Sequence, residues 1–200
     1  MMTEYQKWKS WVSDEVFLGA RKLTQEHLQN CRVFPTRVDM LATLPKGGKV
    51  VEVGTAEGWF ATRILSIAEP TELHLIDINL DNLTGLPRQL ADEGTRVQCH
   101  GGQSAECLSR LPDRTFDWIY IDADHSFEGV MKDAVVAINK IKPDGYLVFN
   151  DYTAYSPREG MTYGVMRAVH DVCLDYGFEA VGLALEDLGY MDIALRRRAG

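Results

Sequence analysis

The stretch Lys49-Val50-Val51-Glu52-Val53-Gly54-Thr55-Ala56-Glu57-Gly58 decides the fold class. Residues 49–53 are mostly apolar and follow the turn sequence at residues 45–48, so they predict a buried strand. Gly54 then allows a sharp turn, and Gly58 opens a helix. A strand that leads through a glycine turn into a helix is the building unit of an α/β sheet.

Strands and helices alternate along the chain from this stretch onward. Apolar runs predict strands at residues 73–76, 96–99, 116–121, 146–149, 178–185 and 190–195. Helical spacing predicts helices at residues 59–68, 127–141 and 164–176, and a leucine stripe at residues 80–90 predicts another that Pro87 breaks or kinks. We expect the last two strands to pair antiparallel. The pattern predicts a Rossmann-like, doubly wound, mostly parallel sheet with helices on both faces.

The composition is that of one globular domain and argues against several classes of partner. The chain has 200 residues, of which 46% are hydrophobic, and a net charge of −8, which argues against nucleic acid or an anionic membrane as a partner. No apolar run reaches the ~20 residues of a membrane span, and the first residues lack a secretory signal. The basic run at residues 196–198 fits a solvated tail better than a nucleic-acid patch.

The spacing of the cysteines indicates free thiols, and the chain divides into two expected segments. The four cysteines lie far apart, without a Cys-x-x-Cys pair, which suits free thiols in the cytoplasm: Cys31, Cys99, Cys107 and Cys173. Residues 1–45 are expected to be mostly helical and to pack on the core or cap the active site. Residues 46–200 form the expected catalytic domain.

The glycine loop after the first strand favours a nucleoside ligand without phosphates. Its Gly-x-x-x-Gly spacing differs from the Gly-x-Gly-x-x-Gly sequence that seats a pyrophosphate. Glu57 in the loop would repel phosphates and favour a ligand with positive charge. A plain structural turn is the alternative interpretation.

Polar residues follow the next two strands. Asp77 follows the strand at 73–76, where a carboxylate can accept hydrogen bonds from both ribose hydroxyls; a helix N-cap is the alternative. Gly102-Gln103-Ser104 follows the strand at 96–99, where polar side chains could reach an adenine edge. Ser104 could equally be only a helix cap.

A second polar group is expected at the same rim. Asp122-Ala123-Asp124-His125 follows one strand and Asn150-Asp151-Tyr152 follows the next. Each carboxylate alone could be a cap or a solvated turn, but their convergence favours a functional site. Oxygen ligands of this kind suit Mg²⁺ or a similar divalent cation.

Together, the segment 50–58, Asp77 and the segment 120–130 resemble class I methyltransferases. More narrowly, they resemble small bacterial O-methyltransferases of the methyltransferase-24 family over about residues 47–152. The resemblance implies a seven-stranded sheet with an antiparallel last strand, and S-adenosylmethionine as cofactor. It implies a cofactor site made of Glu52, Gly54, Thr55, Ala56, Gly58, Asp77, Ile78, Gln103, Ser104 and Asp122.

The resemblance also implies roles for the second polar group. In metal-dependent relatives the positions of Asp122 and Asp151 bind a divalent cation, and Asn150 is a candidate third ligand because Tyr152 replaces the family's asparagine. His125 stands where some relatives have a lysine, and we expect it to be the catalytic base.

The expected function is O-methylation of a hydroxyl on a small molecule such as a sugar, phenol or natural product. Three alternatives stay open: a non-catalytic S-adenosylmethionine-binding domain, an N-methyltransferase and an NAD-dependent oxidoreductase. The missing third glycine argues against the last. The segment 152–163 is either an aromatic lid or ordinary packing, and the sequence does not identify the acceptor. Relatives often pair, so a homodimer is one option for the oligomeric state.

Overall fold

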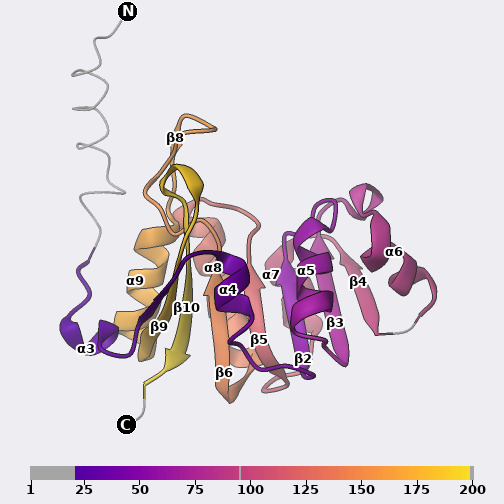
Figure 1. Ribbon diagram of the computed structural model, residues 1–200, viewed down its shortest axis with the longest axis horizontal. Coiled ribbons are helices and arrows are strands. Elements are labelled where there is room, and N and C mark those ends of the chain that lie inside the picture. The colour runs from indigo at the N-terminus through magenta and orange to yellow at the C-terminus, as the bar shows by residue number, and fades with distance from the viewer. Residues whose placement is uncertain (1–20, 95, 199–200) are drawn as a thin grey trace, which may run out of the picture.

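The computed structural model describes residues 21–94 and 96–198. Figure 1 shows one sheet with helices on both faces. The strands are β1 (Arg32–Phe34), β2 (Lys49–Val53), β3 (Glu72–Asp77), β4 (Val97–Gly101), β5 (Phe116–Ile121), β6 (Ile141–Phe149), β7 (Tyr155–Ser156), β8 (Met161–Thr162), β9 (Phe178–Leu185) and β10 (Met191–Arg197). The helices are α3 (Gln25–Leu28), α4 (Arg37–Leu41), α5 (Trp59–Ile67), α6 (Gly85–Asp92), α7 (Ser104–Arg110), α8 (Phe127–Lys140) and α9 (Val165–Tyr176), with 3₁₀ turns η1 (Leu80–Asn82) and η2 (Asp187–Gly189).

The main sheet has eight strands in the order β1-β9-β10-β6-β5-β2-β3-β4. Its pairs are parallel except that β10 runs antiparallel to both β6 and β9. From β2 the chain proceeds to β3 and β4 on one side, whereas β5 and β6 lie on the other. The chain continues from β2 into α5 on one face of the sheet and from β5 into α8 on the other, which leaves a crevice at the carboxyl ends of these strands.

Two hydrophobic clusters pack against the opposite faces of the sheet. In β5, Ile119 and Ile121 join the cluster that α7, α8 and α9 cover. Trp118 and Tyr120 of the same strand join the cluster that α4 and α5 cover. Side chains of a strand alternate between the two faces, so a strand with apolar residues on both faces must lie in the middle of a three-layer fold. The predicted doubly wound architecture with its antiparallel last strand is confirmed.

The prediction of seven strands was wrong by one. β1 comes from the segment expected to be helical and pairs in parallel with β9. Its three residues show no periodicity of their own, and Val33 stays 64% exposed, so only the pairing with a distant strand makes this segment extended. Four side chains from the same segment are buried in the core: Phe34, Met40, Leu41 and Leu44. Residues 1–20 lie outside the described residues.

Two further local predictions were wrong. The leucine stripe forms η1 and α6 rather than one helix, and the break precedes Pro87, which is the third residue of α6, where proline is tolerated. The basic run is not a free tail, because β10 continues through Arg197. Arg196 lies 2.8 Å from Glu179 and Arg198 lies 3.0 Å from Glu26.

No helix in the described part of the chain has both the length and the apolar character needed to cross a membrane.

Gly54 holds the turn after β2 against the loop after β5. Its φ is +87°, and a Cβ built on it would lie 1.9 Å from the backbone oxygen of Asp122. We expect Gly54→Ala to lower the free energy of unfolding by roughly 2–5 kcal/mol, because left-handed strain adds to a backbone collision. Urea denaturation of the purified variant measures this loss.

Gly47→Ala is the matched control. Gly47 has a φ of +68° but nothing within 4 Å of its added Cβ. Only the conformational strain of about 1–2 kcal/mol should remain. Equal losses in the two variants would show that the contact with Asp122 does not constrain the turn.

Candidate functional site

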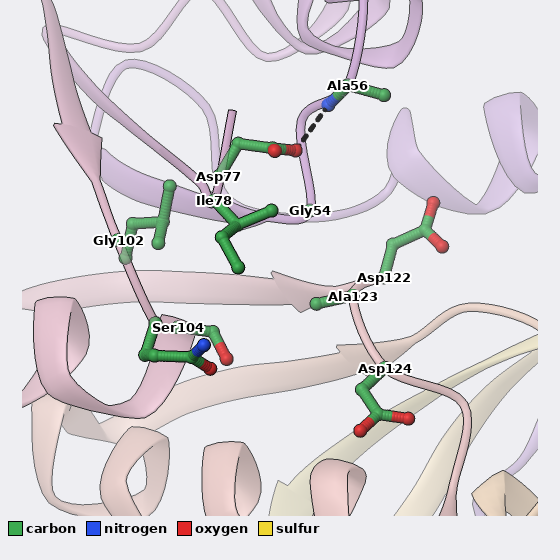
Figure 2. A pocket seen from close by; sticks show the side chains of 11 residues that line it. Gly54, Ala56, Asp77, Ile78, Gly102, Ser104, Asp122, Ala123 and Asp124 are labelled. Atoms are coloured by element: carbon green, nitrogen blue, oxygen red, sulfur yellow. Dashed lines mark hydrogen bonds between the residues drawn. The ribbon is translucent and has the colours of Figure 1, made fainter. Parts of the chain in front are cut away.

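A cavity of about 460 Å³ opens at the carboxyl ends of β2, β3, β4 and β5. Figure 2 shows Asp77 and Ile78 in its middle, Gly102 and Ser104 at one end and Asp122 at the other. We call it the large cavity. Its lining comprises Gly54, Ala56, Ile76, Asp77, Ile78, Gly102, Gln103, Ser104, Asp122, Ala123 and Asp124. Its volume lies within the ~300–1,000 Å³ usual for small-molecule sites.

Asp77 joins two loops of the large cavity. One carboxylate oxygen accepts a hydrogen bond from the backbone N of Ala56 at 2.7 Å, drawn in Figure 2, and the other accepts one from the backbone N of Asn79 at 2.8 Å. The N-cap of η1 is Asn79 itself, so Asp77 does not cap the following helix directly. Each carboxylate oxygen has further lone pairs, which leaves capacity to accept hydrogen bonds from a ligand.

The far end of the large cavity is built by the start of α7. Gln103 is the N-cap residue of this helix, but its side chain makes no capping hydrogen bond. Ser104 is the first helical residue. Ile78 is 72% exposed and presents an apolar surface beside them. This end therefore combines polar groups with an apolar side chain that a planar ring could cover.

A second cavity of about 140 Å³ continues from the first, and the two share Gly54, Ala56 and Asp122. We call it the small cavity. Glu52 in its lining is 1% exposed and accepts a hydrogen bond from the hydroxyl of Thr55. Burial raises the pKa of Glu52 to about 8, and the nearby Asp122 adds to this rise. Glu52 is therefore mainly protonated at neutral pH.

Gly58 lines neither the large cavity nor the small one. It is the N-cap of α5 with a φ of +83°, and a Cβ there would lie 2.7 Å from the side chain of Leu83. The structure explains this glycine by packing. Gly58 was expected in the cofactor site, but the structure places it outside both cavities.

A third cavity of about 290 Å³ lies beside the first two, and we call it the polar cavity. Its lining is Arg37, His125, Asn150, Asp151, Ser156, Arg158, Glu159, Tyr163, Glu186, Asp187 and Tyr190. Every one of these side chains carries a charged group, a hydroxyl, an amide or an imidazole. The β7–β8 hairpin, which the sequence left as lid or packing, forms one wall through Ser156, Arg158 and Glu159.

His125 connects the polar cavity with the large cavity. Its Nε2 lies 3.5 Å from Oδ1 of Asp122 and 3.6 Å from Oδ2 of Asp151. The ring stacks on Tyr163, with centroids 4.4 Å apart and planes at 4°. Burial by itself lowers the pKa of His125, but the two carboxylates outweigh burial and raise the pKa above its ordinary value. The imidazole thus lies where two negative charges favour its protonated form.

A buried polar network supports this arrangement from below. Asn150 donates hydrogen bonds from Nδ2 to the hydroxyl of Tyr120 at 3.1 Å and to Oδ1 of Asp192 at 3.0 Å. Asp192 is fully buried, and burial raises its pKa to about 7. Asn150 is committed to this network, away from Asp151. The two residues follow the end of β6 at Phe149, and the chain turns at Asp151, whose φ is 53°.

The residues expected to bind a divalent cation do not fit one. Within residues 21–94 and 96–198, no group of three or more His, Cys, Asp or Glu side chains is arranged to hold a metal ion. His125 occupies the space between Asp122 and Asp151, and the amide of Asn150 points elsewhere. The hydroxyl of Tyr152 is bonded to His170 at 2.7 Å. Asn150 is therefore not the third ligand that the sequence suggested, because its amide is hydrogen-bonded to Tyr120 and Asp192.

The backbone is strained at two positions of the site. Among the described non-glycine residues, five have a positive φ, and two of these are Ala56 at 46° and Asp151 at 53°. Such conformations persist only where the surroundings enforce them, and they gather at functional sites. Here the hydrogen bond from Ala56 to Asp77 holds the first of them.

The structure brings most of the predicted site residues to one rim. Arg37 and Asp192 also belong to it, although the sequence analysis did not single them out, and so does Tyr163 from the segment 152–163 that the sequence left as lid or packing. Asp192 alone left a signal, as a charged residue within the apolar run Met191-Asp192-Ile193-Ala194-Leu195. Arg37 precedes the whole strand–helix alternation and carries no local signature.

The raised pKa of Glu52 has a consequence for stability. The ordinary pKa of 4.5 applies to the unfolded chain and about 8 to the folded one, so the folded state holds a proton that the unfolded state has lost. Raising the pH from about 5 to 8 should therefore lower stability. Glu52→Gln cannot ionise and should gain stability relative to the wild type across this range. Denaturation midpoints of the wild type and of Glu52→Gln at a series of pH values test this. The same pH dependence in both proteins would contradict it.

Comparison with known proteins identifies the fold and the family. A family model described as "Methyltransferase domain" matches residues 51–152. A relative from Mycobacterium avium (strain 104), named "Putative O-methyltransferase", is 30% identical over 145 residues, covering 68% of this chain and 64% of the relative. The chain therefore spans less than two thirds of that relative's length.

Two solved structures share the fold at low sequence identity. A SAM dependent methyltransferase from Aquifex aeolicus has a TM-score of 0.59 at 16% identity, covering 90% of this chain and 96% of its own. The cyclase SpnF has a TM-score of 0.59 at 15% identity, covering 82% of this chain and 81% of its own. The fold alone thus accommodates more than one kind of chemistry. The family match over residues 51–152 shows that the chain belongs to the methyltransferase-domain family.

Proposed function

We propose that the protein is an S-adenosylmethionine-dependent O-methyltransferase that acts on a small, polar, hydroxylated acceptor. One observation carries this proposal: the imidazole of His125 lines the polar cavity while its Nε2 lies 3.5 Å from Asp122, which lines the large cavity. A proton acceptor thus stands between a site for a nucleoside and a site for a second molecule. The family match and the name of the M. avium relative support the same reaction class.

The large cavity is the proposed place of the adenosyl group. Asp77 would accept hydrogen bonds from the ribose hydroxyls, and Gln103 and Ser104 would face the adenine edge, with Ile78 against its ring. The turn at Gly54–Ala56 would pass close to the ligand. When bound, the cofactor supplies a methyl group on a positively charged sulfur.

His125 is the proposed base for the acceptor hydroxyl. The carboxylates of Asp122 and Asp151 flank its Nε2 at 3.5 and 3.6 Å, and the ring stacks on Tyr163. Only the neutral imidazole can take a proton, and the two carboxylates favour the protonated one. A cationic ligand in the large cavity would offset the negative charge of Asp122 and shift His125 toward its neutral form.

The lining of the polar cavity favours a hydrophilic acceptor. Arg158 lies over the ring of Tyr190, and Glu159, Glu186 and Asp187 surround the same space. An apolar phenol would remove these charged groups from water without replacing their hydrogen bonds, which costs free energy. An acceptor with several hydroxyls can satisfy them. A polyhydroxylated compound therefore fits this cavity better than an unsubstituted phenol.

The other functions have less support. Glu57 and the absence of a third glycine in the loop disfavour the phosphates of NAD. An amine acceptor can already be neutral, so N-methylation would not need His125 as a base. A domain that only binds the cofactor would have no use for a base beside a second cavity.

The test is methyl transfer from radiolabelled S-adenosylmethionine to a panel of polyols, sugars, phenols and amines. We expect His125→Ala to lower turnover of the preferred hydroxyl acceptor by about 10²- to 10⁴-fold, the usual contribution of a positioned base. Affinity for S-adenosylhomocysteine, measured by calorimetry, should change little. Loss of both would mean that His125 is structural.

His170→Gln is the matched control, because His170 bonds to Tyr152 and the backbone of Arg21 and lines none of the three cavities described above. It should keep turnover near that of the wild type. Excess EDTA in the same assay should leave turnover unchanged, since no described ligand set holds a cation. Loss of turnover that Mg²⁺ restores would contradict the metal-free step, and transfer to amines alone would contradict O-methylation.

A further inference from the structure

The small cavity has the charge pattern that an amino acid requires. It continues from the large cavity through Gly54, Ala56 and Asp122. The amino-acid end of S-adenosylmethionine carries an ammonium and a carboxylate, so a site that holds this end needs a negative and a positive partner. An adenosyl group in the large cavity would direct this end into the small one. A role for the small cavity in binding this end rests on the proposed function, since the cofactor is the same.

Two carboxylates can serve as the negative partners of the ammonium group. Asp122 and Glu57 line the small cavity, and either carboxylate can accept hydrogen bonds from an ammonium group. Glu52, which is mainly protonated, adds little negative charge. These residues would attract the ammonium but would repel the carboxylate beside it.

Arg37 is the positive partner. Among the described residues that line the large and small cavities, it is the only lysine or arginine. Arg37 is the first residue of α4. Its backbone is fixed because its N donates a hydrogen bond to Glu186 at 2.5 Å and because Thr36 caps the helix. The guanidinium lies 5.7 Å from the ring centroid of Phe60.

The side chain of Arg37 retains capacity for a further acceptor. Its Nη1 is 3.4 Å from the hydroxyl of Tyr120, and its Nε is 3.6 Å from Glu186, both longer than a usual charge-assisted hydrogen bond of about 2.7–2.9 Å. A guanidinium has five N–H donors in a planar fork that matches a carboxylate. A carboxylate ligand could therefore form shorter bonds than these two.

We infer that Arg37 binds the α-carboxylate of the methionine part of S-adenosylmethionine. Arg37 also lines the polar cavity, so the anchored end would lie at the border of the acceptor site. Asp77 at one end and Arg37 at the other would then fix both ends of the cofactor. The sulfur between them would be held beside Asp122 and His125.

The experiment is a calorimetric comparison of ligands that differ at this end. S-Adenosylhomocysteine carries the complete amino acid, whereas 5′-methylthioadenosine lacks it. We expect Arg37→Met to weaken S-adenosylhomocysteine by about 10- to 100-fold, as expected for a lost charge-assisted bond. The affinity for 5′-methylthioadenosine should stay within about twofold. Arg37→Lys should recover part of the loss because it restores the charge.

Arg63→Met is the matched control, because Arg63 is an exposed arginine of α5 that lies over the ring of Trp59 and lines none of the three cavities, and its loss changes the net charge equally. It should not discriminate between the two ligands. Equal weakening of both ligands by Arg37→Met would make Arg37 structural and overturn the inference, as would no weakening at all.

Wild-type protein alone gives a second test, which does not depend on a variant that folds. It should bind decarboxylated S-adenosylmethionine about 10-fold or more weakly than S-adenosylmethionine. Equal affinities would overturn the role of Arg37 while leaving the proposed function intact. A wild type that binds no adenosyl ligand would overturn both.

Discussion

The contact between the turn at Gly54 and the backbone of Asp122 is the constraint on which the site depends. These two loops follow neighbouring parallel strands whose chains continue in opposite directions, and they meet because no side chain separates them. The meeting places the end of β5 against the glycine loop of β2. Asp122 consequently lines both the large and the small cavity, and His125, three residues later, reaches the polar one.

Charge balance around Asp122 follows from this geometry. Asp122, Asp151 and the buried Asp192 lie close enough to affect one another, and burial raises the pKa of all three. Arg37 and His125 supply the positive charge that opposes them. In the proposed mechanism the imidazole of His125 lies between Asp122 and Asp151, and its positive charge explains why the two carboxylates can converge here.

The sequence was informative wherever a local pattern determines the structure. Continuous apolar runs predicted β2 and β5 at their observed bounds, and polar residues directly after buried strands predicted the position of Asp77 and His125. The topology of parallel strands then required these ends to meet. Gly58 was assigned to the site because a conformational requirement looks the same in sequence whether it serves a ligand or packing.

The remainder depends on contacts between distant segments. β1 is a strand only because β9 offers it a free edge, and Arg37 reaches the site only because β1 leads directly into α4, which packs on the face of the sheet beside β9. The orientation of Asn150 depends on Asp192, which lies 42 residues away in the sequence. No periodicity or motif in one segment encodes such partners, so the walls of the polar cavity beyond His125, Asn150 and Asp151 could not be derived from the sequence.

The most direct test of the central claim is a crystal structure of the protein with S-adenosylhomocysteine. The account predicts the ribose on Asp77, the adenine between Ile78 and Ser104, and the sulfur on the side of Asp122 that faces His125. A ligand whose sulfur points away from His125, or one bound outside the crevice between β2 and β5, would contradict it.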